Sequence, residues 1–261
     1  MTHGKGYVDA GYLQAAGNLL QPMKRRSRDL LRVTVGQSVL DVGCGPGLDT
    51  LAMGPLVGPG GCVVGVDADE EMVTAANQRA ERAGMSEYVR HQRGEASALA
   101  LASGRFDACR SERLFIHLPD TRQALAEMIR VTRSGGWLVV VDTDWGTFSI
   151  DTEQNRIERL LTRFGAEHLS RNGFAGRQLY RLFKTCGLVD ITVELWPVHV
   201  LGDVALVKYL TKLDEIEQGA LKANLITPEE LERWREGLAR SENDGTFFAS
   251  LVMVLVAGRK P

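Results

Sequence analysis

An acidic residue and three glycines stand close together near residue 45, at a spacing that suits contact with a nucleotide-like ligand. The stretch VLDVGCGPGLDT runs from apolar residues into Asp41 and then through Gly43, Gly45 and Gly47. A strand, a glycine loop and a helix in this order present backbone N–H groups and a helix N-terminus to the ligand. We therefore predict a cofactor site at this loop.

The spacing of the glycines separates the classes of cofactor. Nicotinamide enzymes carry GxGxxG and P-loops carry GxxxxGK[ST], whereas this loop reads GxGxG with an acid two residues before its first glycine. The carboxylate of Asp41 would repel a pyrophosphate and accept an ammonium group. Asp67 ends the run VVGVD, where a carboxylate accepts hydrogen bonds from ribose hydroxyls. S-adenosylmethionine fits this combination, and a nicotinamide-dependent reductase is disfavoured by the loop spacing.

Four motifs in order, VLDVGCGPG, VVGVDADEEMV, RGEASAL and FDACRSERLFIHLPD, resemble those of class I S-adenosylmethionine-dependent methyltransferases. The subgroup is that of ubiquinone/menaquinone-biosynthesis and natural-product small-molecule methyltransferases. The resemblance covers about Leu31 to Asp142, and later segments resemble the rest of the subgroup. It implies a Rossmann-like α/β fold, with a seven-stranded, mostly parallel sheet, helices on both faces and an antiparallel last strand.

The resemblance also implies which residues surround the cofactor. Asp67 would bind both ribose hydroxyls, and Ala68 and Met72 would flank the adenine. Glu95, where the family usually has Asp, would face the adenine amine together with Ala96. The remaining residues, which line the methionine moiety, the ribose or the sulfonium, are Asp41, Gly43, Cys44, Gly45, Gly47, Arg110 and Ser111.

Methyl transfer is an in-line displacement that needs a base only if the acceptor must lose a proton. His117, in FIHLPD, is either such a base or substrate contact, or a structural histidine bonded to a neighbouring loop. Asp144 and Trp145 follow the fifth strand and would face the acceptor pocket, and Asp144 is a candidate catalytic residue together with His117. The tryptophan would stack on an aromatic or isoprenoid acceptor, or else be a core residue beside a capping acid. Asn172 is a further candidate substrate contact.

The first 35 residues are predicted to form a helical segment that covers the cofactor site. Tyr7 and Tyr12 would reach the sulfonium or the carboxylate of the cofactor, or else are ordinary residues of an amphipathic helix. The run KRRSR, Lys24 to Arg28, is interpreted as a solvated face, because the chain lacks the basic surface of a nucleic-acid-binding protein.

Strand-like and helix-like runs alternate along the chain, which predicts parallel strands joined by crossover helices. We predict one methyltransferase domain over residues 36–261. Within it, residues 202–243 would form an insertion of two amphipathic helices before the last strand. Leu206, Tyr209, Leu210, Leu213 and Ile216 recur there at helical spacing, as a core stripe or as the lining of an apolar pocket.

Composition sets further limits. The 261 residues are 44% hydrophobic with a net charge of −2, so bulk attraction to nucleic acid or anionic lipid is not expected. The four cysteines form no CxxC pair, and no cluster has metal-ligand spacing, so neither disulfides nor a metal are predicted. We find no signal-peptide pattern and no apolar stretch long enough for a membrane span, so we expect a cytoplasmic protein without a membrane partner.

We therefore predict an enzyme that moves a methyl group from S-adenosylmethionine to a small, largely apolar or aromatic metabolite of secondary metabolism, leaving S-adenosylhomocysteine. One alternative is a quinone-precursor C-methyltransferase. Another is a catalytically silent protein that binds S-adenosylmethionine and acts as a regulator. The sequence leaves open the acceptor atom, the use of a base and whether the chain forms a homo-oligomer.

Overall fold

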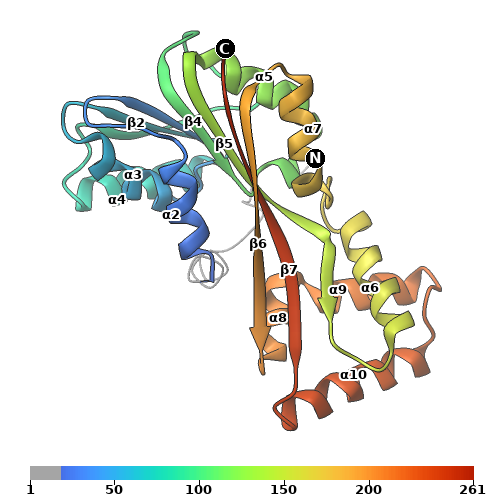
Figure 1. Cartoon of the computed structure of the whole chain (residues 1–261). Coiled ribbons are helices and arrows are strands. Elements are labelled where there is room, and N and C mark those ends of the chain that lie inside the picture. The colour runs from blue at the N-terminus through green and yellow to red at the C-terminus, as the bar shows by residue number, and fades with distance from the viewer. Residues whose placement is uncertain (1–18) are drawn as a thin grey trace.

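A computed structural model describes residues 19–261 of the chain (Figure 1). Tyr7 and Tyr12 lie outside the described residues, so their predicted contacts stay predictions. The described part contains one seven-stranded sheet with the order β3-β2-β1-β4-β5-β7-β6. The strands are β1 (Ser38–Val42), β2 (Cys62–Asp67), β3 (Val89–Arg93), β4 (Phe106–Glu112), β5 (Thr132–Ile150), β6 (Val189–Leu201) and β7 (Phe248–Arg259).

The sheet is parallel except around its last strand. Neighbours from β3 to β5 pair in parallel, and β7 pairs antiparallel with both β5 and β6. The strand order reverses between β1 and β4, so their carboxyl ends open a crevice at the point where ligands bind in such sheets. The predicted fold class is thereby confirmed.

Helices cover both faces of the sheet. In β1, Val39 packs with α2, α3 and α4, whereas Leu40 and Val42 pack with α5 and α7. The alternation of a strand thus assigns each residue to one of two cores. The helical elements are α2 (Gln21–Asp29), α3 (Leu48–Val57), α4 (Glu70–Arg82), η1 (Phe115–His117), α5 (Thr121–Val131), α6 (Asn155–His168), α7 (Ala175–Thr185), α8 (Val204–Thr211), α9 (Leu213–Lys222) and α10 (Pro228–Asn243).

Polar residues at the helix starts follow the expected chemistry. The Asp69 side chain accepts a hydrogen bond from the Glu71 N–H at the start of α4. Thr227 and Glu230 form a reciprocal capping box at the start of α10. These side chains satisfy backbone N–H groups that have no partner within the helix, which explains where the elements begin.

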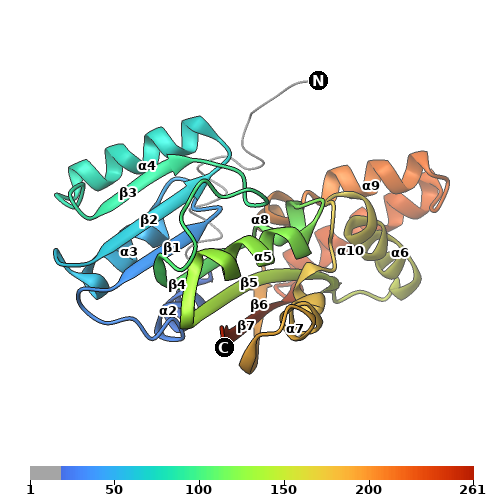
Figure 2. The same cartoon turned by 90° about the horizontal axis from the view of Figure 1, so that it is seen from above.

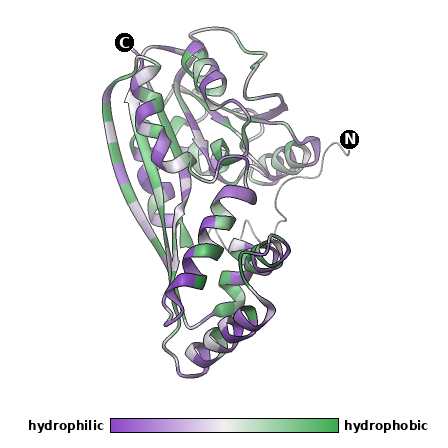
Figure 3. Ribbon diagram, turned by 90° about the vertical axis from the view of Figure 1, so that its right-hand side faces the viewer, coloured by the Kyte–Doolittle hydropathy of each residue, from purple (hydrophilic) through white to green (hydrophobic). Residues whose placement is uncertain are grey.

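Strands β5, β6 and β7 extend beyond the parallel sheet and carry a second lobe, made of their far ends with α6, α8, α9 and α10 (Figures 1 and 2). Its core includes Phe148, Leu161, Ile216 and Trp234. Figure 3 shows hydrophobic and hydrophilic residues mixed along the long strands as well as on the helices. Strand β5 has 19 residues and β6 has 13, because pairing with β7 continues past the parallel part.

The predicted insertion at 202–243 contains three helices, so the prediction of two was wrong in number. Lys212 takes a left-handed conformation with φ of 54° and separates α8 from α9. A left-handed residue cannot continue an α-helix, so one helix ends and the next begins at Lys212 although the apolar residues keep their helical spacing across it. No helix within residues 19–261 is long and apolar enough to cross a membrane.

Candidate functional site

The glycine loop between β1 and α3 depends on left-handed backbone conformations. Gly43, Gly45 and Gly47 have φ values of 74°, 51° and 80°. Residues with a Cβ rarely adopt such values, which explains why glycine recurs at every second position. The N–H groups of Gly43 and Cys44 both donate to the Val66 carbonyl, at 2.8 and 3.1 Å. The loop is therefore tied to the end of β2 before α3 begins.

Asp67, at the carboxyl end of β2, holds the same loop through its side chain. One carboxylate oxygen accepts the Gly45 N–H at 2.7 Å, and the other accepts the Asp69 N–H at 3.0 Å. Burial raises the pKa of Asp67 above its ordinary value, although these N–H groups oppose the rise. Each carboxylate oxygen can accept a second hydrogen bond. The group can thus hold the loop and accept two hydroxyl groups of a ligand together.

The residues predicted to surround an adenine lie beside Asp67. Ala68 is exposed and Met72 is half-buried on the first turn of α4. The Gly94 N–H donates to the Asp67 carbonyl at 2.9 Å, which brings the end of β3 to the end of β2. Glu95 follows with an exposed side chain, and Ala96 is buried. The order of the strands therefore gathers this part of the predicted set at one edge of the crevice.

His91 supports the glycine loop through Thr50, a role that the sequence analysis did not find. Its Nε2 lies 2.6 Å from the Thr50 hydroxyl, which lies 2.8 Å from the Gly47 carbonyl. Asn77 of α4 pairs with both backbone groups of His91. Burial lowers the pKa of His91 to about 4, so the ring is neutral at pH 7.

The histidine ring occupies space that two glycines leave free. A Cβ on Gly65 would lie 2.5 Å from the His91 ring, and a Cβ on Gly47 would lie 3.0 Å from its Nε2. The available signal was Gly65 inside a strand, because a glycine there often marks a close approach. A single histidine in VRHQR carries no such signal by itself.

Asp41 and Arg110 form the centre of a buried ionic cluster on the face of the sheet covered by α2. We name as the α2 cluster three cations and three carboxyl groups: Lys24, Arg28, Asp41, Asp49, Arg110 and Glu112. The Arg110 side chain is 1% exposed, and its Nη1 lies 3.3 Å from Asp41 Oδ1. Burial raises the pKa of Asp41 to about 7, against the effect of Arg110. The carboxyl groups of this cluster bind the Arg110 guanidinium, which the resemblance had placed near the sulfonium.

The run KRRSR is only partly the solvated face that was predicted. Arg25 and Arg26 are exposed, whereas Lys24 and Ser27 are buried against the sheet. Helix α2 places residues three apart on one side, so one side of the run meets the carboxyl groups of the α2 cluster. Cys44 is also buried, which raises the pKa of its thiol and keeps it protonated.

Ser111 and Asp142 lie on the opposite face of the sheet. Ser111 is fully buried, and within residues 19–261 its hydroxyl has no hydrogen-bond partner. Asp142 accepts the N–H groups of Thr143 and Ile116 at 2.7 and 3.2 Å and so holds η1 over the crevice. Burial raises the pKa of Asp142 to about 7.

His117, the last residue of η1, lies between the sheet and the second lobe. Burial, together with the positive charges of Arg113 and Lys212, lowers the pKa of His117 to about 4. Since Lys212 belongs to the junction of α8 and α9, the second lobe comes within electrostatic reach of η1. The ring is neutral at pH 7 and can accept a proton.

The other predicted acceptor contacts are near η1 but are already engaged. Asp144 is buried and accepts Arg177 Nε at 2.6 Å. Trp145 is half-buried and makes an edge contact with Phe148, with ring centres 6.2 Å apart. The Asn172 N–H donates to the Ile116 carbonyl at 3.0 Å. The side chain of Asn172 donates to Gln178 and borders a surface hollow of about 530 Å³.

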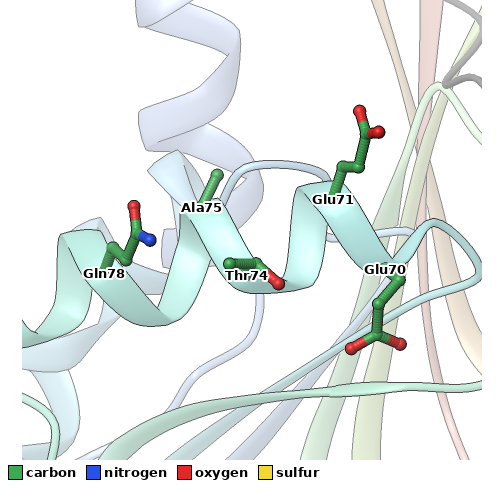
Figure 4. A pocket seen from close by; sticks show the side chains of 5 residues that line it. All are labelled: Glu70, Glu71, Thr74, Ala75 and Gln78. Atoms are coloured by element: carbon green, nitrogen blue, oxygen red, sulfur yellow. The ribbon is translucent and has the colours of Figure 1, made fainter.

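A second hollow, of about 280 Å³, lies on helix α4 (Figure 4). Its lining residues all come from that one helix: Glu70, Glu71, Thr74, Ala75 and Gln78. Their side chains spread along the helix and do not converge on one point. This hollow is a surface depression outside the crevice. The described residues form no group of three or more His, Cys, Asp and Glu side chains that could hold a metal ion.

Comparison with known proteins gives a matching family model and several relatives. The family model described as a methyltransferase domain matches residues 40–140. An uncharacterized 37.1 kDa protein of transposon TN4556 from Streptomyces fradiae is 34% identical, over 88% of this chain and 65% of that protein. A demethylmenaquinone methyltransferase from Halalkalibacterium halodurans is 31% identical, over 63% of this chain and 72% of that enzyme.

Two further similarities concern shorter or more distant matches. Nocamycin O-methyltransferase from Saccharothrix syringae is 37% identical, over 46% of this chain and 44% of that enzyme. The chain thus spans less than two thirds of the transposon protein and of this enzyme. The crystal structure of YcgJ from Bacillus subtilis is 24% identical with a TM-score of 0.65, over 93% of this chain and 98% of that one. This structure shares the fold.

Proposed function

The chain belongs to the class I S-adenosylmethionine-dependent methyltransferase family, and we propose that it transfers the methyl group of S-adenosylmethionine to a small, largely apolar metabolite. The observation that carries the proposal is the hydrogen bond between Asp67 and the glycine loop. The carboxylate holds the Gly45 N–H at 2.7 Å and keeps acceptor capacity for a ribose. A nicotinamide cofactor would instead place a pyrophosphate at the glycine loop, close to the carboxylate of Asp41.

The residues of the crevice fit S-adenosylmethionine. Asp67 would accept the ribose hydroxyls, with Ala68, Met72, Glu95 and Ala96 around the adenine. The loop glycines allow the backbone to approach the methionine part, and the buried hydroxyl of Ser111 supplies a hydrogen-bonding group at the end of β4. When bound, the cofactor supplies a methyl group on a sulfonium, which is a good leaving group.

The protein's own contribution to the transfer is alignment and exclusion of water. His117 would accept a proton if the acceptor must lose one, although its lowered pKa makes the ring a weak base at pH 7. We assign Asp144 to positioning, because Arg177 holds its carboxylate. The backbone N–H of the adjacent Trp145 donates to the Gly173 carbonyl at 2.8 Å, which fixes the chain at this point. Trp145 and Asn172 would then border the acceptor.

The apolar character of the acceptor rests on the second lobe, which lies across the crevice from the loop and has an apolar core that Trp145 and Phe164 join. A role in secondary metabolism agrees with the likeness to nocamycin O-methyltransferase. Transfer to a quinone precursor is the second candidate, favoured by the likeness to demethylmenaquinone methyltransferase. A regulator without turnover would bind the cofactor and methylate neither class.

Thermal unfolding with S-adenosylhomocysteine, NAD and NADP in separate samples tests the cofactor. At about 100 times Kd, a ligand stabilises the protein by about 2.7 kcal/mol. For a chain of this size we expect a rise in Tm of several degrees with S-adenosylhomocysteine alone, at about 2–4 °C per kcal/mol. A rise with a nicotinamide cofactor alone would overturn the proposal.

Transfer of a labelled methyl group to phenols, isoprenoids and a demethylated quinone then separates the acceptor classes. Labelled small apolar products support the main proposal, and a carbon-methylated quinone alone supports the second candidate. Cofactor binding without any labelled product would favour the silent protein.

A further inference from the structure

The α2 cluster buries more charge than an ordinary helix–sheet contact. Its two arginines and all three carboxyl groups are largely removed from solvent, and the Lys24 side chain is 8% exposed. Burying ions is costly, and apolar residues of similar size often stabilise a fold as well or better. A cluster of this kind therefore calls for a role other than simple adhesion between α2 and the sheet.

The cluster includes one carboxyl group at each end of the glycine loop. Asp41 stands two residues before Gly43, and Asp49 stands two residues after Gly47 on the first turn of α3. Arg110 lies beside Asp41 on the neighbouring strand, in direct register, with its Nη2 3.5 Å from Asp49 Oδ1. One guanidinium thus joins the residues that enter and leave the loop.

Helix α2 completes the cluster from outside the sheet. Lys24 Nζ bonds Asp49 Oδ2 and lies 2.6 Å from Glu112 Oε1, and Arg28 Nη1 lies 3.1 Å from Asp49 Oδ1. The Ser27 hydroxyl accepts Arg110 Nε at 3.2 Å. Although burial acts to raise it, Arg110 and Lys24 lower the pKa of Asp49, so this carboxylate remains charged.

We propose that Lys24 and Arg110 are positioning residues for the amino-acid end of the cofactor. They hold Asp41 and the first turn of α3, and thereby set the shape and the charge of the loop from Gly43 to Gly47. The ribose and adenine end would be contacted by Asp67 and the ends of β2 and β3, which are not part of the α2 cluster. The inference rests on the proposed function and adds to it that α2 determines how the tail of the ligand is recognised.

Two ligands that differ only at the tail test this inference. S-adenosylhomocysteine carries the amino-acid tail, and 5′-methylthioadenosine keeps the adenine and ribose without it. We expect Lys24→Met to weaken S-adenosylhomocysteine about tenfold, the scale of one hydrogen bond to a charged group. Affinity for 5′-methylthioadenosine should stay within about twofold. Both dissociation constants are measured by calorimetry on the full chain.

A matched control lies on the same helix. Arg26 forms an exposed ion pair with Glu194 at 2.6 Å, and its side chain is 44% exposed. Arg26→Met should change neither dissociation constant. Asp49→Asn keeps the size of its side chain and removes one charge, so it provides a second variant if Lys24→Met does not fold. It should also weaken S-adenosylhomocysteine selectively. Lys24→Arg should restore most of the lost affinity.

Each outcome bears on one proposal. Selective loss of S-adenosylhomocysteine affinity in Lys24→Met or Asp49→Asn supports the inference. Equal weakening of both ligands, or no weakening, would show that the cluster serves the fold alone and would overturn it while the proposed function stands. If the unmodified chain binds neither ligand, the proposed function fails and the inference falls with it.

Discussion

Around the glycine loop, polar side chains form hydrogen bonds and ion pairs between one element and the next. The elements of the second lobe are held together mainly by contacts between apolar side chains. The loop is held by Asp67, His91 and the α2 cluster, each bonded across elements. The second lobe has a core of aliphatic and aromatic residues, and its buried Glu217 is bonded within the lobe to Trp234 and Arg235.

The difference separates two tasks. Hydrogen bonds have direction, so a polar framework can place N–H groups and carboxylates against one particular cofactor. Apolar packing has no direction and tolerates exchange of residues when volume is kept. The half with the glycine loop is therefore readable as motifs, whereas the second lobe can exchange residues without leaving a recognisable pattern.

The largest expected effect is on stability, from a change in the second lobe. Trp234 is 1% exposed, and its indole N–H donates to Glu217 at 3.0 Å. Trp234→Ala should lower the free energy of unfolding by about 3–5 kcal/mol, because it leaves a cavity and removes a partner of a buried carboxylate. Urea unfolding measures the loss, with the exposed neighbour Arg233→Ala as the control.

The same variant tests whether the two regions are separable. Dissociation constants for S-adenosylhomocysteine, measured on the folded fraction, should stay within about twofold of the unmodified protein. A parallel loss of affinity would mean that the second lobe also shapes the cofactor site.

The next effect is on cofactor affinity. Asp67→Ala removes a carboxylate that holds the Gly45 N–H and is proposed to bind the ribose. Two hydrogen bonds to a charged group correspond to about 3 kcal/mol or more, so affinity for S-adenosylhomocysteine should fall at least about 100-fold. Calorimetry measures the affinity, and circular dichroism checks that the fold is kept. Unchanged affinity would refute the placement of the ribose.

A smaller loss of cofactor affinity is expected from a change at His91, which supports the glycine loop. His91→Phe keeps an aromatic ring and removes the contact with the Thr50 hydroxyl at 2.6 Å. The loss of one neutral hydrogen bond is worth about 1 kcal/mol, so affinity for S-adenosylhomocysteine should fall about fivefold. Thr50→Val should give a similar loss, and the double variant should lose less than the sum, because both changes break one network. Fully additive losses would contradict that network.

The last effect is a change of stability with pH. Burial lowers the pKa of His91 from 6.5 to about 4, so the folded chain favours the neutral ring. The corresponding stability is present above pH 6.5 and is lost as the pH falls toward 4, because the unfolded chain takes up the proton first. The free energy of unfolding of the unmodified protein minus that of His91→Phe should therefore decrease from pH 7 to pH 5. A difference that is flat with pH would contradict the assignment.

Much of the cofactor half could be predicted because its signals are local. The glycines of the loop report left-handed conformations at their own positions, and Asp67 ends a strand whose apolar run is visible in the sequence. The alternation of strands and helices predicts the parallel sheet. Each of these signals depends on neighbouring residues and on the geometry of the backbone.

Other features needed the tertiary structure, because they join distant parts of the chain. Ser27 and Arg110 are bonded although 83 residues separate them, and this contact turns part of an apparently solvated run into a buried anchor. His91 and Thr50 meet across 41 residues. A residue type alone does not tell which carboxylate an arginine will meet.

By itself the sequence determined the class of fold, the place of the glycine loop and the carboxylate at the end of β2, since periodicity and glycine spacing act over a few residues. Only the tertiary structure decided that Arg110 turns to the α2 cluster, that His91 supports the loop, and that β5 to β7 extend into a second lobe. Those outcomes depend on which side chains share a buried volume. That sharing is set by the packing of the whole chain.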